Sequence, residues 1–163
     1  MLVVARSLRE LSFSSLMKIY EESNRENAAT LWPDVPAERA LAMAEEEFYH
    51  YLCDIFFITP HAFYAIWIEN GEYVSALRLD PYRDGMLLEA LETSPSCRRK
   101  GFGEKLLRSV LSHTHGRIYA HVHKSNIASL KLHKKCGFQK ICDHAVYIDG
   151  SIDSKSCTLC YEV

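Results

Sequence analysis

The sequence predicts a mixed α/β domain, in which helices pack on the faces of one mixed sheet. Two observations support this class. β-rich runs and helical stripes follow one another in the order β-α-α-β-β-β-α-β-α-β-β, and apolar residues make up 48% of the chain against 25% charged residues. No repeat, low-complexity tract or Pro/Gly/Ser-rich linker interrupts the 163 residues. We therefore expect residues 1–163 to form a single domain around one sizeable core.

Turn and capping residues set the expected elements in the first half of the chain. Ser12 is a candidate N-cap for a helix whose apolar residues recur at helical spacing. Two prolines and mixed polarity predict a loop at 24–36, and Pro36 suits the first turn of a second helix. Asn70-Gly71 between two β-rich runs is typical of a hairpin. In chain order we expect a strand at 2–8, a helix from 13, a loop at 24–36, a helix at 37–56, a hairpin at 61–80 and a strand at 86–93.

The second half alternates between helical and β patterns. Apolar residues from Phe102 to Leu111 form a helical stripe, and Gly116 separates this helix from the next strand. Gly137 stands at the C′ position of a further helix, and a turn around Asp149-Gly150 joins the last two strands. The expected elements are a helix at 101–114, a strand at 117–123, a helix at 126–136 and strands at 138–148 and 156–163.

Composition excludes several classes of function. The net charge of −2 argues against non-specific binding to nucleic acid, which needs an excess of Lys and Arg. No apolar run approaches the ~20 residues of a membrane span, and the first ten residues do not resemble a signal peptide. Cys157 and Cys160 have CxxC spacing, but residues three apart in a strand point to opposite faces. We expect six reduced thiols, no bound metal, no membrane or nucleic-acid partner, and a cytoplasmic protein.

Residues 98–103, "RRKGFG", combine the features of an anion site. They lie between an expected strand and an expected helix, whose first N–H groups have no partner inside the helix. Glycine lets the backbone approach a ligand, and three cations add attraction. Leu106 breaks a dinucleotide fingerprint, and no P-loop pattern occurs. These six residues alone fit a pyrophosphate site and a basic turn equally well.

Residues 126–138, "NIASLKLHKKCGF", contain a second polar pattern. Asn126, Ser129 and His133 are spaced i, i+3 and i+7, so they share one face of the expected helix. Such a face is either solvated or, beside the helix at 101–114, one wall of a groove.

The two stretches together resemble the GCN5-related N-acetyltransferase (GNAT) superfamily. Arg98-x-x-Gly101-x-Gly103 matches its [QR]-x-x-G-x-[GA] signature. Residues 126–138 resemble its later N-x-x-A-x-x-L-Y-x-x-x-G-F pattern, with Ser129 for Ala and His133 where Tyr is usual. The motif resemblance covers roughly 88–138, and the N-terminal third matches in element order alone. It implies a GNAT-type acyl-CoA N-acyltransferase fold.

The resemblance implies acetyl-CoA as the cofactor. The pyrophosphate would bind mainly to backbone N–H groups of the loop and helix start, while the pantetheine arm would pair with the main chain of the strand before the loop. Asn126 and Ser129 would flank the cofactor from the other side. The implied cofactor residues are Leu91, Thr93, Arg98, Arg99, Lys100, Gly101, Phe102, Gly103, Glu104, Asn126 and Ser129.

The resemblance also implies attack of an amine on the thioester, with a base, an oxyanion donor and, in some members, an acid. The N–H near Leu91 would be the oxyanion donor. We prefer Glu89 as base, because strand alternation places it with Leu91 and Thr93 and turns Glu92 the other way; it otherwise faces solvent or pairs with a cation. His133 is either the acid or a polar neighbour of the sulfur.

The acceptor is the least defined part of the prediction. We expect its pocket near 24–36 and 81–86, where Trp32, Tyr82, Glu26 and Asp34 are either ligands of an aromatic or cationic amine or ordinary loop residues. The leading reading is an acetyl-CoA-dependent N-acetyltransferase that acts on a small-molecule primary amine as a monomer or homodimer. The alternative is a non-catalytic acyl-CoA-binding or regulatory module on the same fold.

Overall fold

The computed structural model describes residues 1–162 and places a seven-stranded sheet at their centre. The strand order is β1-β2-β3-β4-β5-β9-β6, and neighbours are antiparallel except β4 and β5, which are parallel. The strands of this sheet are β1 Leu2–Ala5, β2 Phe63–Glu69, β3 Glu72–Tyr82, β4 Gly85–Thr93, β5 Arg117–His123, β6 Gln139–Cys142 and β9 Ser156–Tyr161.

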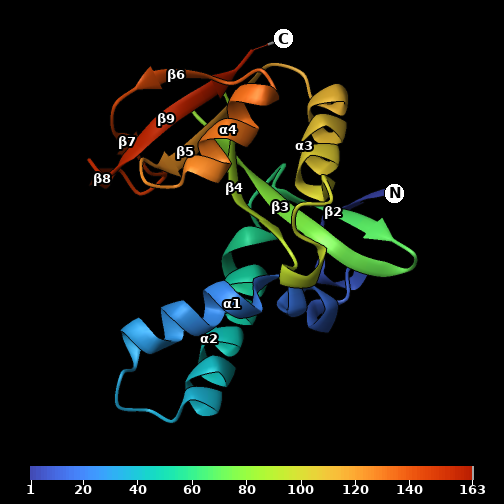
Figure 1. Ribbon diagram of the computed structural model, residues 1–163, viewed down its shortest axis with the longest axis vertical. Helices are drawn as coiled ribbons and strands as arrows, with labels where there is room; N and C mark the ends of the chain where they lie inside the picture. The colour runs from blue at the N-terminus through green and yellow to red at the C-terminus, as the bar shows by residue number, and fades with distance from the viewer. Residues whose placement is uncertain (163) are drawn as a thin grey trace.

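Helices cover both faces of the sheet (Figure 1). On one side lie α1 (Phe13–Leu31) and α2 (Ala37–Tyr51), the latter continuing into a short π-helical segment, η2 (Leu52–Phe56). On the other lie α3 (Phe102–His113) and α4 (Ile127–Lys135). Each pair of helices buries its own apolar cluster against the sheet, so the mixed α/β class predicted from the sequence is confirmed.

Local signals in the sequence mark several boundaries correctly. The side chain of Ser12 accepts a hydrogen bond from the N–H of Ser15 at the start of α1. Asn70 and Gly71 both have positive φ, 51° and 82°, as a type I′ hairpin turn between β2 and β3 requires. Gly137 follows α4 with a φ of 98°, in the left-handed region expected after a helix C-cap.

The predicted loop at 24–36 is largely wrong. α1 continues to Leu31, and only residues 32–36 connect it to α2. Residues 24–31 contain neither Pro nor Gly, so nothing in them breaks the helix. Pro33 is the first residue that does, because it lacks an N–H and clashes with the preceding turn.

The predicted strand at 138–148 is also wrong as a continuous element. It divides into β6 and the short β7 (Ala145–Val146), with a bend at 143–144. The hydroxyl of Thr158 on β9 donates to the carbonyl of His144 at 2.7 Å and holds this bend. β7 then leaves the main sheet and pairs with β8 (Ile152–Asp153).

All six cysteines are free thiols, as predicted. Cys157 lies in the core beneath α3, whereas Cys160 packs near Tyr82 and Tyr119 on the other face of β9, so the CxxC spacing does not bring the sulfurs together. Within residues 1–162 no helix has the length and apolar character that crossing a membrane requires.

Candidate active site

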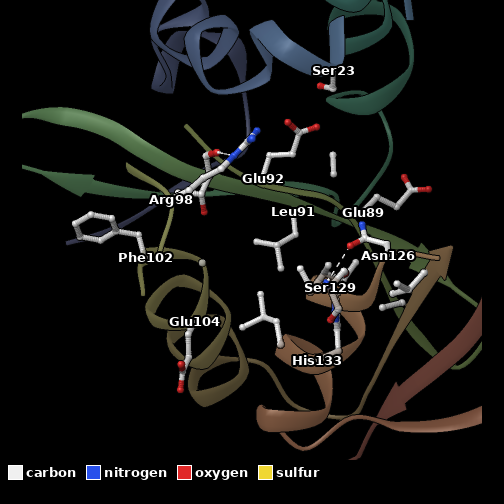
Figure 2. Close-up of a pocket in the computed structure, with 18 of the residues that line it drawn as sticks. Ser23, Glu89, Leu91, Glu92, Arg98, Phe102, Glu104, Asn126, Ser129 and His133 are labelled. Atoms are coloured by element: carbon white, nitrogen blue, oxygen red, sulfur yellow. Dashed lines mark hydrogen bonds between the residues drawn. The ribbon is translucent and has the colours of Figure 1, made fainter. Parts of the chain in front are cut away.

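A pocket opens where the two parallel strands of the sheet separate. β4 and β5 pair from Gly85↔Arg117 to Leu88↔Ala120 and no further. Beyond that point a pocket of about 880 Å³ lies between them and reaches from the start of α3 to the middle of α1 (Figure 2). The residues of β4 that line it are Leu88, Glu89, Ala90, Leu91, Glu92 and Thr93.

A β-bulge interrupts β4 at the mouth of this pocket. The register with β3 moves from Arg78↔Glu89 to Ala76↔Glu92, so Leu77 faces both Ala90 and Leu91. Ala90 has a φ of 52°, a conformation that costs a non-glycine residue about 1–3 kcal/mol. Its carbonyl accepts a hydrogen bond from the hydroxyl of Tyr20 at 2.8 Å.

The bulge corrects the prediction about the two glutamates of β4. Glu89 and Glu92 lie opposite Arg78 and Ala76, which are two residues apart and therefore on one face of β3. Both carboxylates thus point to the α1 side, whereas Leu91 packs into the core on the α3 side. Alternation fails here because the inserted residue reverses the order of faces.

The loop before α3 presents backbone to the pocket. Gly101 is the N-cap of α3 with a φ of 79°, and no side chain caps the helix. A Cβ on Gly103 would lie 3.2 Å from the Oγ1 of Thr93, so glycine permits the helix start to approach β4 closely. The first N–H groups of a helix face a ligand in such an arrangement, and the helix dipole favours an anion there.

The cations of this loop are largely used within the protein. Arg98 pairs with Glu22 of α1 and donates to the carbonyl of Thr93, and Lys100 donates to the carbonyl of Ser96. Glu104 pairs with Arg108 and Lys135, outside the loop. Of the predicted loop residues, the pocket is lined by Arg98, Arg99, Gly101, Phe102, Gly103 and Glu104, while Lys100 lies outside it.

The polar face of α4 forms the opposite wall, as the spacing predicts. Asn126 caps the helix by accepting the N–H of Ser129 at 3.1 Å, and both residues line the pocket together with His133 (Figure 2). His133 is 2% exposed, and its ring stacks edge-on against Phe138 at 4.9 Å. All three residues line the pocket, with His133 buried, Ser129 half-buried and Asn126 exposed.

His133 has a defined tautomer. Its Nδ1 lies 2.9 Å from the carbonyl oxygen of Ser129, which can only accept, so Nδ1 carries the proton. Its Nε2 is buried and has no hydrogen-bond partner within residues 1–162. Burial lowers the pKa of His133, with the Ser129 carbonyl opposing that change. The neutral ring thus has no free proton to give to the pocket, since Nδ1–H is bonded to Ser129 and Nε2 carries none.

The half of the pocket below α1 is acidic. Glu22, Ser23 and Glu26 reach it from α1, and Glu89 and Glu92 from β4. Burial raises the pKa of Glu92, and Glu22 and Glu26 add to this, although Ser23 and Arg98 act in the opposite direction. Two of the four carboxylates have ionic partners, since Glu22 pairs with Arg98 and Glu89 with Arg78.

Glu89 belongs to a charged group beside the pocket. Its carboxylate lies 3.2 Å from Arg78, whose guanidinium stacks over Tyr51 at 4.9 Å. Asp80 is 3.9 Å from the same guanidinium and is 5% exposed. Burial and then the Glu89 carboxylate raise the pKa of Asp80 to about 6. The sequence left two alternatives to a catalytic role for Glu89, exposure to solvent or pairing with a cation, and the structure shows the cation pair.

His121 of β5 is a pocket residue that our sequence reasoning missed. It lines the pocket on the same face of the sheet as Tyr119, between Tyr82 and Tyr147, whose rings lie 5.6 and 5.1 Å away. Neither of its ring nitrogens has a partner in the described part of the chain, and burial lowers its pKa. Extending the β4–β5 register by one step places it beside Glu89, a signal visible only once the pairing is known.

The predicted acceptor loops lie largely outside the pocket. Glu26 lines it, but Trp32, Asp34 and Tyr82 do not. Because α1 is longer than expected, Trp32 lies ten residues beyond Glu22, about 15 Å along the helix. Tyr82 is buried against Tyr119 and donates to the carbonyl of Val146.

Comparison with known families identifies the class of protein to which this fold and pocket belong. The model of the acetyltransferase (GNAT) family matches residues 15–138, so the chain belongs to the GNAT family, as the sequence motifs predicted. Members of this family use acetyl-CoA. No curated protein matches the sequence.

Solved structures with this fold are numerous and distant in sequence. The PaiA N-acetyltransferase from Thermoplasma acidophilum, in complex with coenzyme A, is 13% identical with a TM-score of 0.64, over 100% of this chain and 99% of that one. The ribosomal-protein-S18-alanine N-acetyltransferase from Escherichia coli is 16% identical with a TM-score of 0.63, over 98% and 92%. The IAA acetyltransferase from Bacillus cereus ATCC 14579 is 16% identical with a TM-score of 0.58, over the whole of both chains.

Proposed function

We propose that this protein is an acetyl-CoA-dependent N-acetyltransferase that transfers an acetyl group to a primary amine of a small molecule within a ternary complex. The observation that carries the proposal is a single pocket with two unlike halves. The half beside α3 offers backbone donors, and the half below α1 offers carboxylates. The bulge of β4 lies between them.

The half beside α3 fits acetyl-CoA. The uncapped N–H groups of α3 would hold the pyrophosphate, and the closeness of Gly103 to Thr93 keeps side chains out of the way. The main chain of Leu91 and Thr93 would pair with the pantetheine arm, since β4 has no strand partner there on the β5 side. Asn126, Ser129 and the ring of His133 would lie beside it on α4.

The chemistry needs few groups from the protein. Acetyl-CoA supplies an activated thioester carbonyl. The amine nitrogen forms a bond to its carbon, the carbon–sulfur bond breaks, and the electron pair leaves on the sulfur of coenzyme A. The N–H of Leu91 would stabilise the negative charge that develops on oxygen, and a base would remove the proton of the amine.

We propose Glu89 as that base, with His121 as the competing group. Glu89 is a carboxylate at the pocket wall, oriented by Arg78. His121 is an imidazole on the same face; burial lowers its pKa, and in the neutral ring one of its two unpartnered nitrogens is a proton acceptor. We assign no acid role to His133, because the proton of its neutral ring is already donated to the carbonyl of Ser129. A coenzyme A thiolate leaves readily without one.

The acidic half favours a cationic amine over a neutral or acidic one. Glu26 and Glu92 reach the pocket without an ion pair to Lys or Arg among residues 1–162. An ammonium group of the acceptor would relieve their mutual repulsion and the cost of burying Glu92. Diamines and amino-acid amides are acceptors of this kind.

Release of free coenzyme A thiol tests the proposal directly. The panel contains diamines, neutral amines, amino acids and peptides with a free N-terminus, each with acetyl-CoA. We expect turnover to be highest with small cationic amines. Turnover of the peptides alone would replace the small-molecule acceptor with a protein one. Tight binding of acetyl-CoA without turnover of any amine would favour the non-catalytic module.

A further inference from the structure

The bulge of β4 is held from two sides by hydroxyl groups. Tyr20 of α1 donates to the carbonyl of Ala90 at 2.8 Å, and Ser75 of β3 donates to the carbonyl of Glu92 at 2.7 Å. These two carbonyls flank Leu91, the residue whose N–H would be the oxyanion donor. Because Ala90 has positive φ without being glycine, its conformation persists only where the surroundings enforce it.

Tyr20 is well suited to enforce it. Its side chain is 4% exposed, and its ring packs edge-on against Phe48 and Tyr64 at 5.7 and 6.5 Å. Burial, followed by the neighbouring Tyr64, raises the pKa of Tyr20 well above its usual value, so the hydroxyl keeps its proton and remains a donor. The ring is thus fixed by packing, and its hydroxyl donates to the Ala90 carbonyl.

The direction of the Leu91 N–H follows from this contact. A trans peptide is planar, so its C=O and N–H point in opposite directions, and residues 1–162 contain no cis peptide. With the carbonyl of Ala90 turned to Tyr20 on α1, the N–H of Leu91 points away from α1. In a regular strand without the bulge this peptide would instead lie in the sheet and donate along the ladder.

We infer that Tyr20 is a positioning residue for catalysis, which orients the peptide between Ala90 and Leu91 so that the Leu91 N–H faces the acetyl carbonyl. The inference rests on the proposed function. It also links the two halves of the pocket, since the same turn of α1 carries Glu22 and Ser23 of the acidic half. A purely structural Tyr20 would stabilise α1 against the sheet without affecting the transfer step.

Tyr20→Phe tests the inference, with Tyr161→Phe as control. Tyr161 of β9 is a half-buried tyrosine that packs against Phe138 on the α3 side of the sheet, away from Tyr20. For Tyr20→Phe we expect kcat to fall about 10-fold or more, a fraction of the loss that follows removal of an oxyanion donor. The KM for acetyl-CoA should change less than about 2-fold. Tyr161→Phe should keep its kcat.

Ala90→Gly distinguishes positioning from packing. Glycine adopts positive φ without steric cost, so the bulge no longer depends on the hydroxyl. The double variant Tyr20→Phe/Ala90→Gly should therefore recover part of the lost kcat, although it restores no contact of α1. An unchanged kcat in a folded Tyr20→Phe, or a loss that Ala90→Gly leaves untouched, overturns the inference. If Tyr20→Phe alone does not fold, Ser75→Ala releases the other side of the bulge and should lower kcat in the same way; an unchanged kcat there overturns it.

A spectroscopic readout separates this inference from the proposed function. In protein labelled with ¹⁵N-leucine, acetyl-CoA should shift the amide resonance of Leu91 downfield in the wild type, and the shift should shrink in Tyr20→Phe. If the wild type turns over no amine, the proposed function fails while this shift still reports on Tyr20. An equal shift in both proteins overturns the role of Tyr20 even where turnover is established.

Discussion

His133 shows how burial decides the chemistry of one residue. Its position in the motif suggests an acid, but its ring is 2% exposed and donates its single proton to the carbonyl of Ser129. Burial also lowers the pKa of His133, so the ring binds a second proton less readily at neutral pH. A tyrosine at this position would carry an O–H donor, whereas the unprotonated Nε2 of this imidazole can only accept and is buried.

The lowered pKa of His133 makes the stability of the protein depend on pH. As the pH falls below about 6.5, the unfolded chain binds a proton at this histidine before the folded protein does, so the free energy of unfolding decreases. His133→Gln should therefore show a smaller loss of stability between pH 7.5 and pH 5.5 than the wild type, measured by urea unfolding. His115→Gln, the same change at an exposed position, is the control. An equal loss in all three proteins would contradict this.

Glu89 and His121 can be separated by their variants. Glu89→Gln keeps the shape of the side chain and removes the proton acceptor, so kcat/KM for the amine should fall about 100-fold at neutral pH with acetyl-CoA affinity unchanged. Glu72→Gln, in the exposed β2–β3 hairpin, is the control. If Glu89→Gln turns over normally and His121→Gln does not, the base is His121. In that case kcat/KM should rise with pH through a pKa below the usual histidine value.

At the scale of elements, we expect the loop before α3 to bind coenzyme A through its backbone more than through its charges. Arg98 and Lys100 are engaged within the protein, while Gly101 carries the positive φ that begins the helix. The arrangement of N–H groups therefore depends on a glycine rather than on any single cation.

Gly101→Val and Arg99→Gln test this order of importance. A β-branched residue at positive φ is strongly disfavoured, so Gly101→Val should distort the first turn of α3 and weaken coenzyme A binding about 10-fold or more. Arg99→Gln, which removes one charge, should weaken it less. Gly71→Val imposes the same strain on the β2–β3 hairpin, also in open space, and is the matched control. Calorimetric titration measures all four proteins; a larger effect of Arg99→Gln would reverse the argument.

The elements were predicted well where the determinants are local. The Ser12 cap, the Asn70-Gly71 turn and Gly137 act within a few residues, and the structure confirms all three. The extent of α1 differs from the prediction because two prolines and mixed polarity predict a loop over the whole of 24–36, although helix-breaking by proline acts only near its own position. The division between β6 and β7 was missed because it depends on the contact of His144 with β9, a distant strand.

At the scale of the whole molecule, the pocket joins segments from α1, β4, β5, α3 and α4, so a ligand there binds only the folded chain. Acetyl-CoA should therefore raise the melting temperature. At 100 times its Kd the stabilisation is about 2.7 kcal/mol, which corresponds to roughly 5–10 °C for a chain of this size. Differential scanning fluorimetry measures the shift, and Gly101→Val should reduce it. The absence of any shift at millimolar acetyl-CoA would contradict the cofactor assignment.

The sequence by itself determined the order of elements, the glycine loop before α3 and the shared face of Asn126, Ser129 and His133, because helical spacing and turn chemistry are properties of neighbouring residues. Tertiary structure alone decided the rest of the site. The bulge at Ala90 depends on the register with β3 and puts Glu89 on the face of β4 opposite to Leu91. His121 reaches the pocket because β5 pairs with β4. Long-range pairing sets such relations, and it leaves no local mark in the chain.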